Sequence, residues 1–290
     1  MTENSLKYNS MIVPNSNIVK EIKKGNYSIS YKKISIPNTD HFKSVIKNLK
    51  KETPSETNIC LVLKSKNCDY NILPYVRAIN DNSSMIEYIS VQSIEDAIRL
   101  RLSGIKIPIM LLYAHSPRYY ELLMKFNIEP SFIIPNDDKY IDAYKKLKFH
   151  LWIDTGMGRD GLMFQELKNV DLKKYTFSGI GTHLNGIPYI KRNGNKDKLV
   201  KSYDLHHTNN QIKNFNNTVK QFDQLGLKYT YKHAAASPAI QINRSEAFYN
   251  LIRVGRLFTD KKCKNRNSSV LIIKTKLYKT HISQIKDVKK

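Results

Sequence analysis

Short apolar runs rich in β-branched residues alternate with amphipathic stretches along most of the chain. Such runs are typical of buried strands, and the amphipathic stretches between them are typical of helices. The pattern predicts strands at 59–63, 86–91, 107–113, 131–134, 149–153, 176–182, 229–233 and 250–253. It predicts helices at about 71–80, 93–103, 117–127, 137–146, 163–168 and 205–225, with a short helix after Ser237.

Residues that favour helix ends support several of these boundaries. Ser93 can cap a helix whose third residue is Asp96. Pro117 suits the first position of a helix, and Gly104 and Gly226 suit the position just after one. These signals predict helices that separate successive strands.

Eight strands alternating with helices favour a parallel sheet, and their number favours a closed (β/α)8 barrel of the TIM type. An open, doubly wound α/β sheet is the alternative. The barrel is expected at 34–262, after a polar N-terminal extension at 1–33. From residue 269 the chain alternates apolar and polar residues without a following helix, so 263–290 is expected to begin a second, all-β domain. The charged stretch 184–204 is expected to be a solvated loop or a lid.

The composition changes this picture little but excludes several classes of protein. The chain has 290 residues, a net charge of +23 and a mean hydropathy of −0.48. The excess is lysine spread along the chain together with asparagine, isoleucine and tyrosine, a pattern that A/T-rich codons explain, so nucleic acid is not an expected partner. No apolar run is long enough for a membrane helix, and the N-terminus lacks the apolar core of a secretory signal. Three scattered cysteines predict neither disulfides nor a metal site and favour the cytoplasm.

Candidate chemistry gathers where the predicted strands end, which is the catalytic edge of a barrel. Lys64 directly follows an apolar strand, where a lysine can lose its proton and bond to a carbonyl cofactor. Ser237 begins a short helix, and Gly255 follows the last strand, where backbone N–H groups can hold a phosphate. Arg253 ends that same strand. A lysine facing a phosphate site is the arrangement that pyridoxal 5′-phosphate requires.

The run from Gly156 to Gly161 also matches the G-x-G-x-x-G pattern of dinucleotide sites. Such a site needs an acidic residue at the end of the next strand, and that strand ends at Thr182 and His183. A dinucleotide site is therefore not expected.

Five motifs in order give the chain a family resemblance. They are SVQSIEDAIRLRLSGIKIPIMLL at 90–112, WIDTGMGRDGL at 152–162, GIGTHLNG at 179–186, HAAASPAI at 233–240 and IRVGRLF at 252–258. From about residue 34 onward the sequence resembles alanine racemase, a pyridoxal phosphate enzyme in which a barrel precedes a β domain. The resemblance implies interconversion of L- and D-alanine by removal and return of the Cα proton.

The resemblance assigns roles to individual residues, beginning with three side chains. Lys64 matches the lysine that binds the cofactor covalently and acts as a catalytic base. Arg159 matches the arginine that contacts the phenolic oxygen of the cofactor and the carboxylate of the substrate. His183 matches the histidine beside the cofactor ring.

Ser237 and the backbone of Gly255 and Arg256 match the phosphate site. Arg253 matches the arginine that donates to the pyridine nitrogen. Because an arginine stays protonated, such a donor keeps the nitrogen unprotonated and the ring a weaker electron sink.

Several departures from the family pattern bear on activity. Cys68 stands in place of a phosphate-binding tyrosine, Trp152 in place of a lysine that is often carbamylated, and Ala236 in place of an asparagine. The second base of the family, a tyrosine of the β domain supplied across a dimer interface, would lie beyond residue 290.

The sequence therefore predicts a racemase-like protein with impaired activity, for which a family-type homodimer is doubtful. A non-catalytic barrel that binds pyridoxal phosphate, and one half of a split racemase, are the alternatives.

Overall fold

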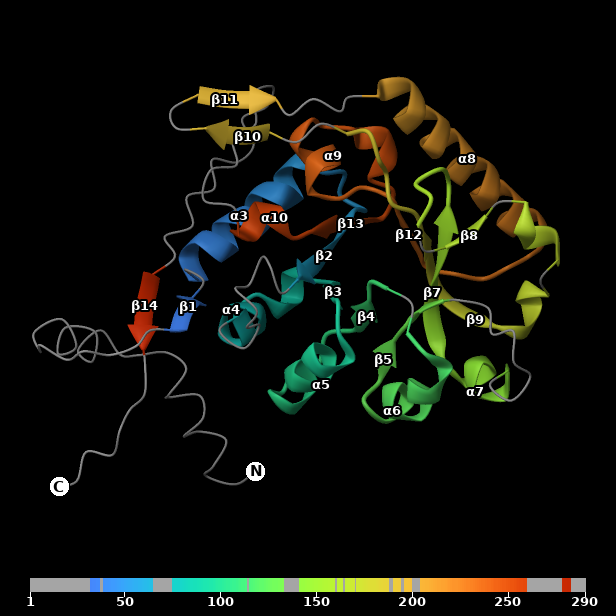
Figure 1. Ribbon diagram of the computed structural model, residues 1–290, viewed down its shortest axis with the longest axis horizontal. Coiled ribbons are helices and arrows are strands. Elements are labelled where there is room, and N and C mark those ends of the chain that lie inside the picture. The colour runs from blue at the N-terminus through green and yellow to red at the C-terminus, as the bar shows by residue number, and fades with distance from the viewer. Residues whose placement is uncertain are drawn as a thin grey trace, which may run out of the picture.

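The computed structural model describes residues 32–36, 39–64, 75–113, 115–132, 141–159, 161–163, 165–169, 171–187, 190–193, 196–199, 204–259 and 278–282. Parallel strands occupy the middle of the molecule and helices lie around them (Figure 1). Residues 1–31, Cys68 and most of 263–290 lie outside the described residues, and so do the predictions made for them. The parallel strands and flanking helices form an α/β fold.

One five-stranded parallel sheet contains the first strands of the predicted pattern and the last one. Its order is β13 (Leu251–Val254), β2 (Asn58–Leu63), β3 (Tyr88–Val91), β4 (Ile109–Leu111) and β5 (Ile128–Glu129). All four pairings are parallel. Most of these residues are buried, as expected for strands that are covered on both faces.

A second parallel sheet contains the middle of the pattern. Its order is β12 (Tyr231–His233), β9 (Thr176–Gly181), β7 (Lys148–Asp154) and β6 (Ser131–Phe132), with the short β8 (Leu162–Met163) paired to β7. These pairings are also parallel.

The two sheets meet at two places. Only Pro130 separates β5 from β6, so one extended segment pairs with β4 of one sheet and with β7 of the other. Beyond β12, Ala236 forms an isolated parallel bridge with Arg253 of β13. The carboxyl ends of all these strands therefore face one edge.

Helices connect the strands largely where the sequence predicts them. They are α4 (Val76–Asn80), α5 (Ile94–Leu102), α6 (Tyr120–Lys125), α7 (Ile141–Lys146), α8 (Leu205–Gln224), α9 (Ser237–Gln241) and α10 (Arg256–Thr259). The Ser93 hydroxyl accepts a hydrogen bond from the Asp96 backbone N–H at 3.1 Å, as predicted. Gly104 and Gly226 follow their helices with φ of 86° and 70°.

Two expectations for local structure are wrong. The stretch 163–168 is not an α-helix, because Met163 belongs to β8 and a 3₁₀-helix covers Glu166–Asn169. The stretch 184–204 is not simply a loop, because it contains an antiparallel hairpin of β10 (Ile190–Asn193) and β11 (Lys196–Leu199).

The sequence analysis also misses α3 (Thr39–Glu52), which packs against α4 and α10. Its buried residues Phe42, Val45, Ile46 and Leu49 lie at helical spacing, but lysines separate them.

The first and last described strands pair with each other outside the parallel sheets. β1 (Lys32–Ile36) and β14 (Tyr278–Ile282) are antiparallel and lie side by side in Figure 1. β14 falls in the stretch where strands are predicted after residue 269. The second domain stays a prediction, because β14 is the one element described after residue 259.

Within the described ranges, no helix combines the length and the apolar character that crossing a membrane requires. The same residues contain no group of three His, Cys, Asp or Glu side chains arranged to hold a metal ion.

Candidate functional site

A cavity of about 390 Å³ opens at the carboxyl ends of the strands, and all seven predicted site residues line it. They are Lys64, Arg159, His183, Ser237, Arg253, Gly255 and Arg256. The other lining residues are Val62, Gln92, Leu112, Tyr113, Trp152, Ala236 and Pro238. No carboxylate occurs among these described residues, so the cavity is positively charged and suits an anionic ligand.

Lys64 lies where the predicted first strand ends and faces Tyr113. Its Nζ is 3.5 Å from the Tyr113 hydroxyl and 5.6 Å from the centre of the ring. The guanidinium carbon of Arg159 lies 5.5 Å from the same ring. Tyr113 therefore lies near both of the cations that the family resemblance assigns to cofactor and substrate.

The sequence analysis misses Tyr113 and Gln92 as cavity residues. Gln92 follows β3 directly, and Tyr113 lies two residues beyond β4. The signal that marks Lys64, a polar residue just past a buried strand, would have found both.

The glycine-rich loop before Arg159 is a turn organised by one carboxylate. Asp154 Oδ1 accepts the backbone N–H groups of Gly156, Met157 and Gly158 at 2.9, 2.8 and 3.2 Å. Asp154 Oδ2 accepts the backbone N–H of Arg159 at 3.0 Å. These N–H groups are occupied by a side chain, so they are not a phosphate cradle, which agrees with the rejection of a dinucleotide site.

Two of the glycines have backbone angles that this turn requires. Gly156 and Gly158 have φ of 129° and 68°, which side chains with a Cβ rarely adopt. The turn places Arg159 among the residues that line the cavity.

Two short helices begin beside each other on the same side as Lys64, because α9 follows β12 and α10 follows β13, which pairs directly with β2. Ser237 is the first residue of α9, and its hydroxyl accepts the backbone N–H of Gly255 at 3.2 Å. Ala236 occupies the cap position, where it offers no side-chain hydrogen bond. The bond from Gly255 holds the start of α10 against the start of α9.

Arg253 is buried and donates mainly to the backbone. Nη1 donates to the carbonyl of His233 at 3.0 Å, and Nη2 donates to those of Thr182 and Ala234 at 2.7 and 3.0 Å. Its guanidinium lies over the ring of Trp152 at 4.8 Å. Burial lowers the pKa of Arg253 to about 10, which leaves it charged at neutral pH.

His183 is kept neutral by its surroundings. Burial, and then the charges of Arg253, Arg159 and Lys64, lower the pKa of His183 to about 3. Its Nδ1 lies 3.4 Å from Nη2 of Arg253. A neutral imidazole adds no charge to the cavity and offers a flat face to a ring.

Gly181→Ala is expected to destabilise the fold by ~1–3 kcal/mol, because it overpacks the core next to the cavity. A Cβ at Gly181 would lie 1.9 Å from Cε1 of His233, so the imidazole has to move away from Arg253. Urea denaturation of the two proteins measures the difference. Unchanged stability would show that the core accepts a methyl group here.

The comparisons with known proteins agree with this geometry. The family model for the N-terminal domain of alanine racemase matches residues 38–259, which is well over half of the chain. The chain belongs to the alanine racemase family. The predicted family resemblance is thereby confirmed.

The relatives with similar sequences are racemases. An alanine racemase of Carboxydothermus hydrogenoformans is 29% identical over 210 residues, which cover 69% of this chain and 53% of that protein. An amino-acid racemase of Enterococcus faecalis is 30% identical over 221 residues, which cover 73% of this chain and 29% of that protein. The chain thus spans about half or less of the length of these relatives.

Solved structures show the same fold. The alanine racemase of Clostridium difficile 630 superposes with a TM-score of 0.67 at 20% identity, over 86% of this chain and 63% of that one. At this identity the likeness concerns the fold alone.

Two departures from the alanine racemase pattern lie in the cavity. Trp152 is buried, and its Nε1 has no hydrogen-bond partner in the described structure. Ala236 lines the wall beside Ser237 without a polar side chain. The third departure, Cys68, lies outside the described residues.

Proposed function

We propose that this chain binds pyridoxal 5′-phosphate through Lys64 and acts on the Cα proton of a small amino acid, with alanine as the expected substrate. The observation that carries the proposal is the position of Lys64 in a cationic cavity that also contains Arg159, Arg253 and Arg256. The racemases among its sequence relatives support the same reaction class.

The described residues fit this cofactor. Its phosphate needs hydroxyl and N–H donors, which Ser237 and the start of α9 offer, whereas the Gly255 N–H already donates to the Ser237 hydroxyl. Its aldehyde needs an amine, which Lys64 offers with loss of one water. The unpartnered Nε1 of buried Trp152 adds a donor to the wall of the cavity. Ala236 offers no donor, so weaker retention of the cofactor than in the family is expected.

We also propose that the two sheets close into one eight-stranded barrel. The shared segment around Pro130 and the bridge between Ala236 and Arg253 support closure at both seams. In such a barrel the cavity lies at the mouth, and Ser237, Gly255 and Lys64 follow three neighbouring strands, β12, β13 and β2.

When bound, the cofactor withdraws electrons from the substrate and makes its Cα proton acidic. Arg159 would hold the substrate carboxylate, and its position near the same Tyr113 ring as Lys64 supports this role. Lys64 would take or return the Cα proton on one face. Arg253 would donate to the pyridine nitrogen, and neutral His183 would lie beside the ring without adding charge.

Inversion also needs an acid on the opposite face of Cα. Within residues 1–290 the family resemblance assigns one base, Lys64. We therefore propose that this polypeptide alone exchanges the Cα proton of one alanine enantiomer faster than it inverts it. A missing proton-transfer group typically costs ~10²–10⁴-fold in rate.

Proton exchange in D2O tests the function. L-alanine and D-alanine are each incubated with the cofactor-loaded chain, and NMR follows loss of the Cα proton while chiral chromatography follows inversion. Exchange of one enantiomer with retention is expected. Exchange of neither would support a non-catalytic cofactor protein, and fast inversion would place a second base within these 290 residues. Inversion that appears only with a separately expressed family β domain would support a split racemase.

The partners follow from this function. A small amino acid is the proposed ligand, and neither nucleic acid nor a membrane surface is proposed as a partner. The cytoplasm is the proposed location, and a family-type homodimer is not proposed for the 290 residues alone.

Binding of the cofactor should quench the fluorescence of Trp152. Trp152 is the one tryptophan of the sequence, and it lines the cavity. Cofactor bound to Lys64 would share the cavity with Trp152, and its visible absorption band would accept the excitation energy of the indole. Titration with pyridoxal phosphate measures the affinity, and pyridoxal without phosphate should bind more weakly. A visible band that forms without quenching would place the cofactor on a lysine outside this cavity.

A further inference from the structure

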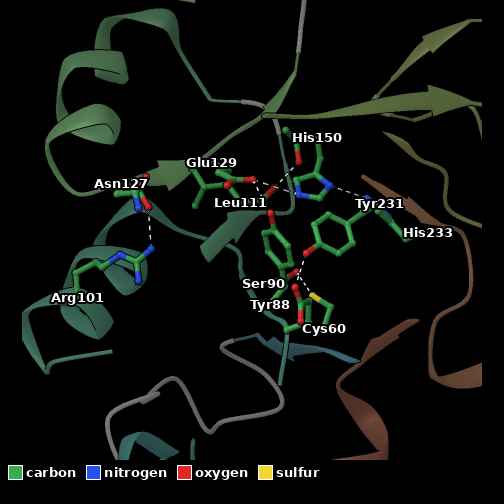
Figure 2. Close-up of polar contacts among 12 residues, drawn as sticks. Cys60, Tyr88, Ser90, Arg101, Leu111, Asn127, Glu129, His150, Tyr231 and His233 are labelled. Atoms are coloured by element: carbon green, nitrogen blue, oxygen red, sulfur yellow. Dashed lines mark hydrogen bonds and ion pairs between the residues drawn. The ribbon is translucent and has the colours of Figure 1, made fainter. Parts of the chain in front are cut away.

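Two buried histidines lie side by side in the core beneath the cavity. His150 belongs to β7 and His233 to β12, and both are fully buried. Nδ1 of His150 lies 3.0 Å from Nε2 of His233. Figure 2 shows His150 between His233 on one side and Glu129 on the other.

Glycines of β9 make room for both rings. A Cβ at Gly179 would lie 2.7 Å from Nδ1 of His150, and one at Gly181 would lie 1.9 Å from Cε1 of His233. The space for the histidine pair is therefore built into the strand that separates β7 from β12.

The contacts of His233 determine which of its nitrogens carries a proton. Nδ1 of His233 meets Nη1 of Arg253, which can only donate. Nδ1 must therefore accept. A neutral imidazole carries one proton, so this proton is on Nε2, which donates to His150. Burial and the charge of Arg253 hold the pKa of His233 well below its usual range, in agreement with a neutral ring.

The same reasoning applies to His150. Its Nδ1 accepts from His233, so its own proton is on Nε2. This nitrogen faces Oε2 of Glu129 at 3.4 Å, a longer contact than an ordinary hydrogen bond. The Tyr88 hydroxyl donates to the same carboxylate oxygen at 3.1 Å.

Glu129 is suited to stay ionised at the end of this chain. Burial opposes its charge, but the contacts with His150, Ser178 and Tyr88 outweigh burial and lower its pKa. Glu129 also lines a second cavity of about 680 Å³, together with Tyr88, Lys148 and Thr176. The last two lie at the amino ends of their strands, so this cavity is opposite the first.

We propose that Glu129 and His150 are positioning residues for Arg253, which they reach through one directed chain of contacts from Arg253 through His233 and His150 to Glu129. The chain keeps a lone pair of His233 facing the guanidinium, so Arg253 is held in one orientation at the wall of the cofactor cavity. The effect on the cofactor rests on the proposed function, whereas the chain itself does not.

Nitrogen NMR of the protein without cofactor tests the chain directly. The sequence has eight histidines, and the variants His150→Asn and His233→Asn assign the two signals. Both residues are expected as neutral rings protonated on Nε2. A proton on Nδ1 of His233, or a charged His150, would overturn the proposal without any further variant.

Variants at Glu129 test its role as the end of the chain. Glu129→Leu removes the acceptor that faces Nε2 of His150, so His150 should show a mixture of the two neutral forms. His233 should change less, because Arg253 also fixes its form. Glu129→Gln keeps an oxygen that faces Nε2 of His150 and can accept from Tyr88, so it should restore the Nε2–H form of His150. Glu87→Leu is the matched control. Glu87 accepts a hydrogen bond from the Tyr231 hydroxyl in the same region, but it is not part of the chain of contacts from Arg253 to Glu129. Unchanged histidine signals in Glu129→Leu would contradict the proposal.

The loaded protein tests the effect on Arg253. Glu129→Leu should shift the absorbance maximum of the bound cofactor in the same direction as Arg253→Gln and weaken binding roughly tenfold, the effect of about one hydrogen bond. Glu87→Leu should change neither. If Glu129→Leu alters the NMR signals of His150 and His233 but does not shift the absorbance maximum of the bound cofactor, the positioning role is refuted. If the unmodified chain binds no cofactor, the proposed function fails while the NMR result still decides the chain.

Discussion

Lys64→Ala is expected to abolish covalent attachment of pyridoxal phosphate and to lower Cα proton exchange by at least ~10²–10⁴-fold. Lys64 is the lysine among the residues that line the cationic cavity, and the proposed function uses it both to hold the cofactor and to move the proton. Borohydride reduction followed by peptide mass spectrometry locates the attachment, and exchange in D2O measures the proton transfer.

Lys148→Ala is the matched control for this experiment. Lys148 begins β7 at the opposite end of the strands and lines the second cavity. It should retain the visible band and the exchange rate of the unmodified chain. A cofactor that remains attached in Lys64→Ala would show that another lysine binds it and would remove the basis of the proposed site.

The ends of strands explain why the site residues could be predicted. In a parallel sheet every carboxyl end lies at one edge, so residues that follow buried runs converge even when they are distant in sequence. Lys64 and His183 follow such runs, Arg253 lies near the end of one, and all three line one cavity. Gln92 and Tyr113 also lie just past buried strands, so the same rule predicts that they line the cavity.

Other features depend on geometry that the sequence pattern does not contain. His150 and His233 are 83 residues apart, and they meet only because β7 and β12 both pair with β9. Both histidines lie within strands, where the apolar pattern marks positions as buried without telling which side chains meet. The role of Asp154 depends in the same way on positive φ at Gly156 and Gly158.

The errors in secondary structure have local causes. α3 has the apolar spacing of an amphipathic helix with lysines on its other face, so the pattern itself predicts it, and its apolar face packs against α4 and α10. The stretch 163–168 is short and begins in a two-residue strand beside β7, which leaves too few residues for a stable helix.

Arg253→Gln is expected to lower the free energy of unfolding by ~3 kcal/mol or more and to change the spectrum of bound cofactor. The guanidinium satisfies buried carbonyls of Thr182, His233 and Ala234, and a buried acceptor left unsatisfied costs about 1–3 kcal/mol. Glutamine has a shorter side chain with fewer donors, so it cannot reach all three. The substitution also removes the guanidinium, which in the proposed function donates a hydrogen bond to the pyridine nitrogen of the cofactor.

Urea denaturation and absorbance spectra together separate the two roles of Arg253. Arg77→Gln is the matched control, since Arg77 is 71% exposed and its contact with Asp81 is 3.8 Å long, and exposed pairs contribute little. Arg253→Lys should recover only part of the stability. It keeps the positive charge but loses the planar pair of donors that bridges β9 and β12. A destabilised Arg253→Gln protein with an unchanged spectrum would make Arg253 a structural residue alone. A normal stability with a shifted spectrum would mean that the three carbonyls find other donors, and that the buried guanidinium is kept for the cofactor.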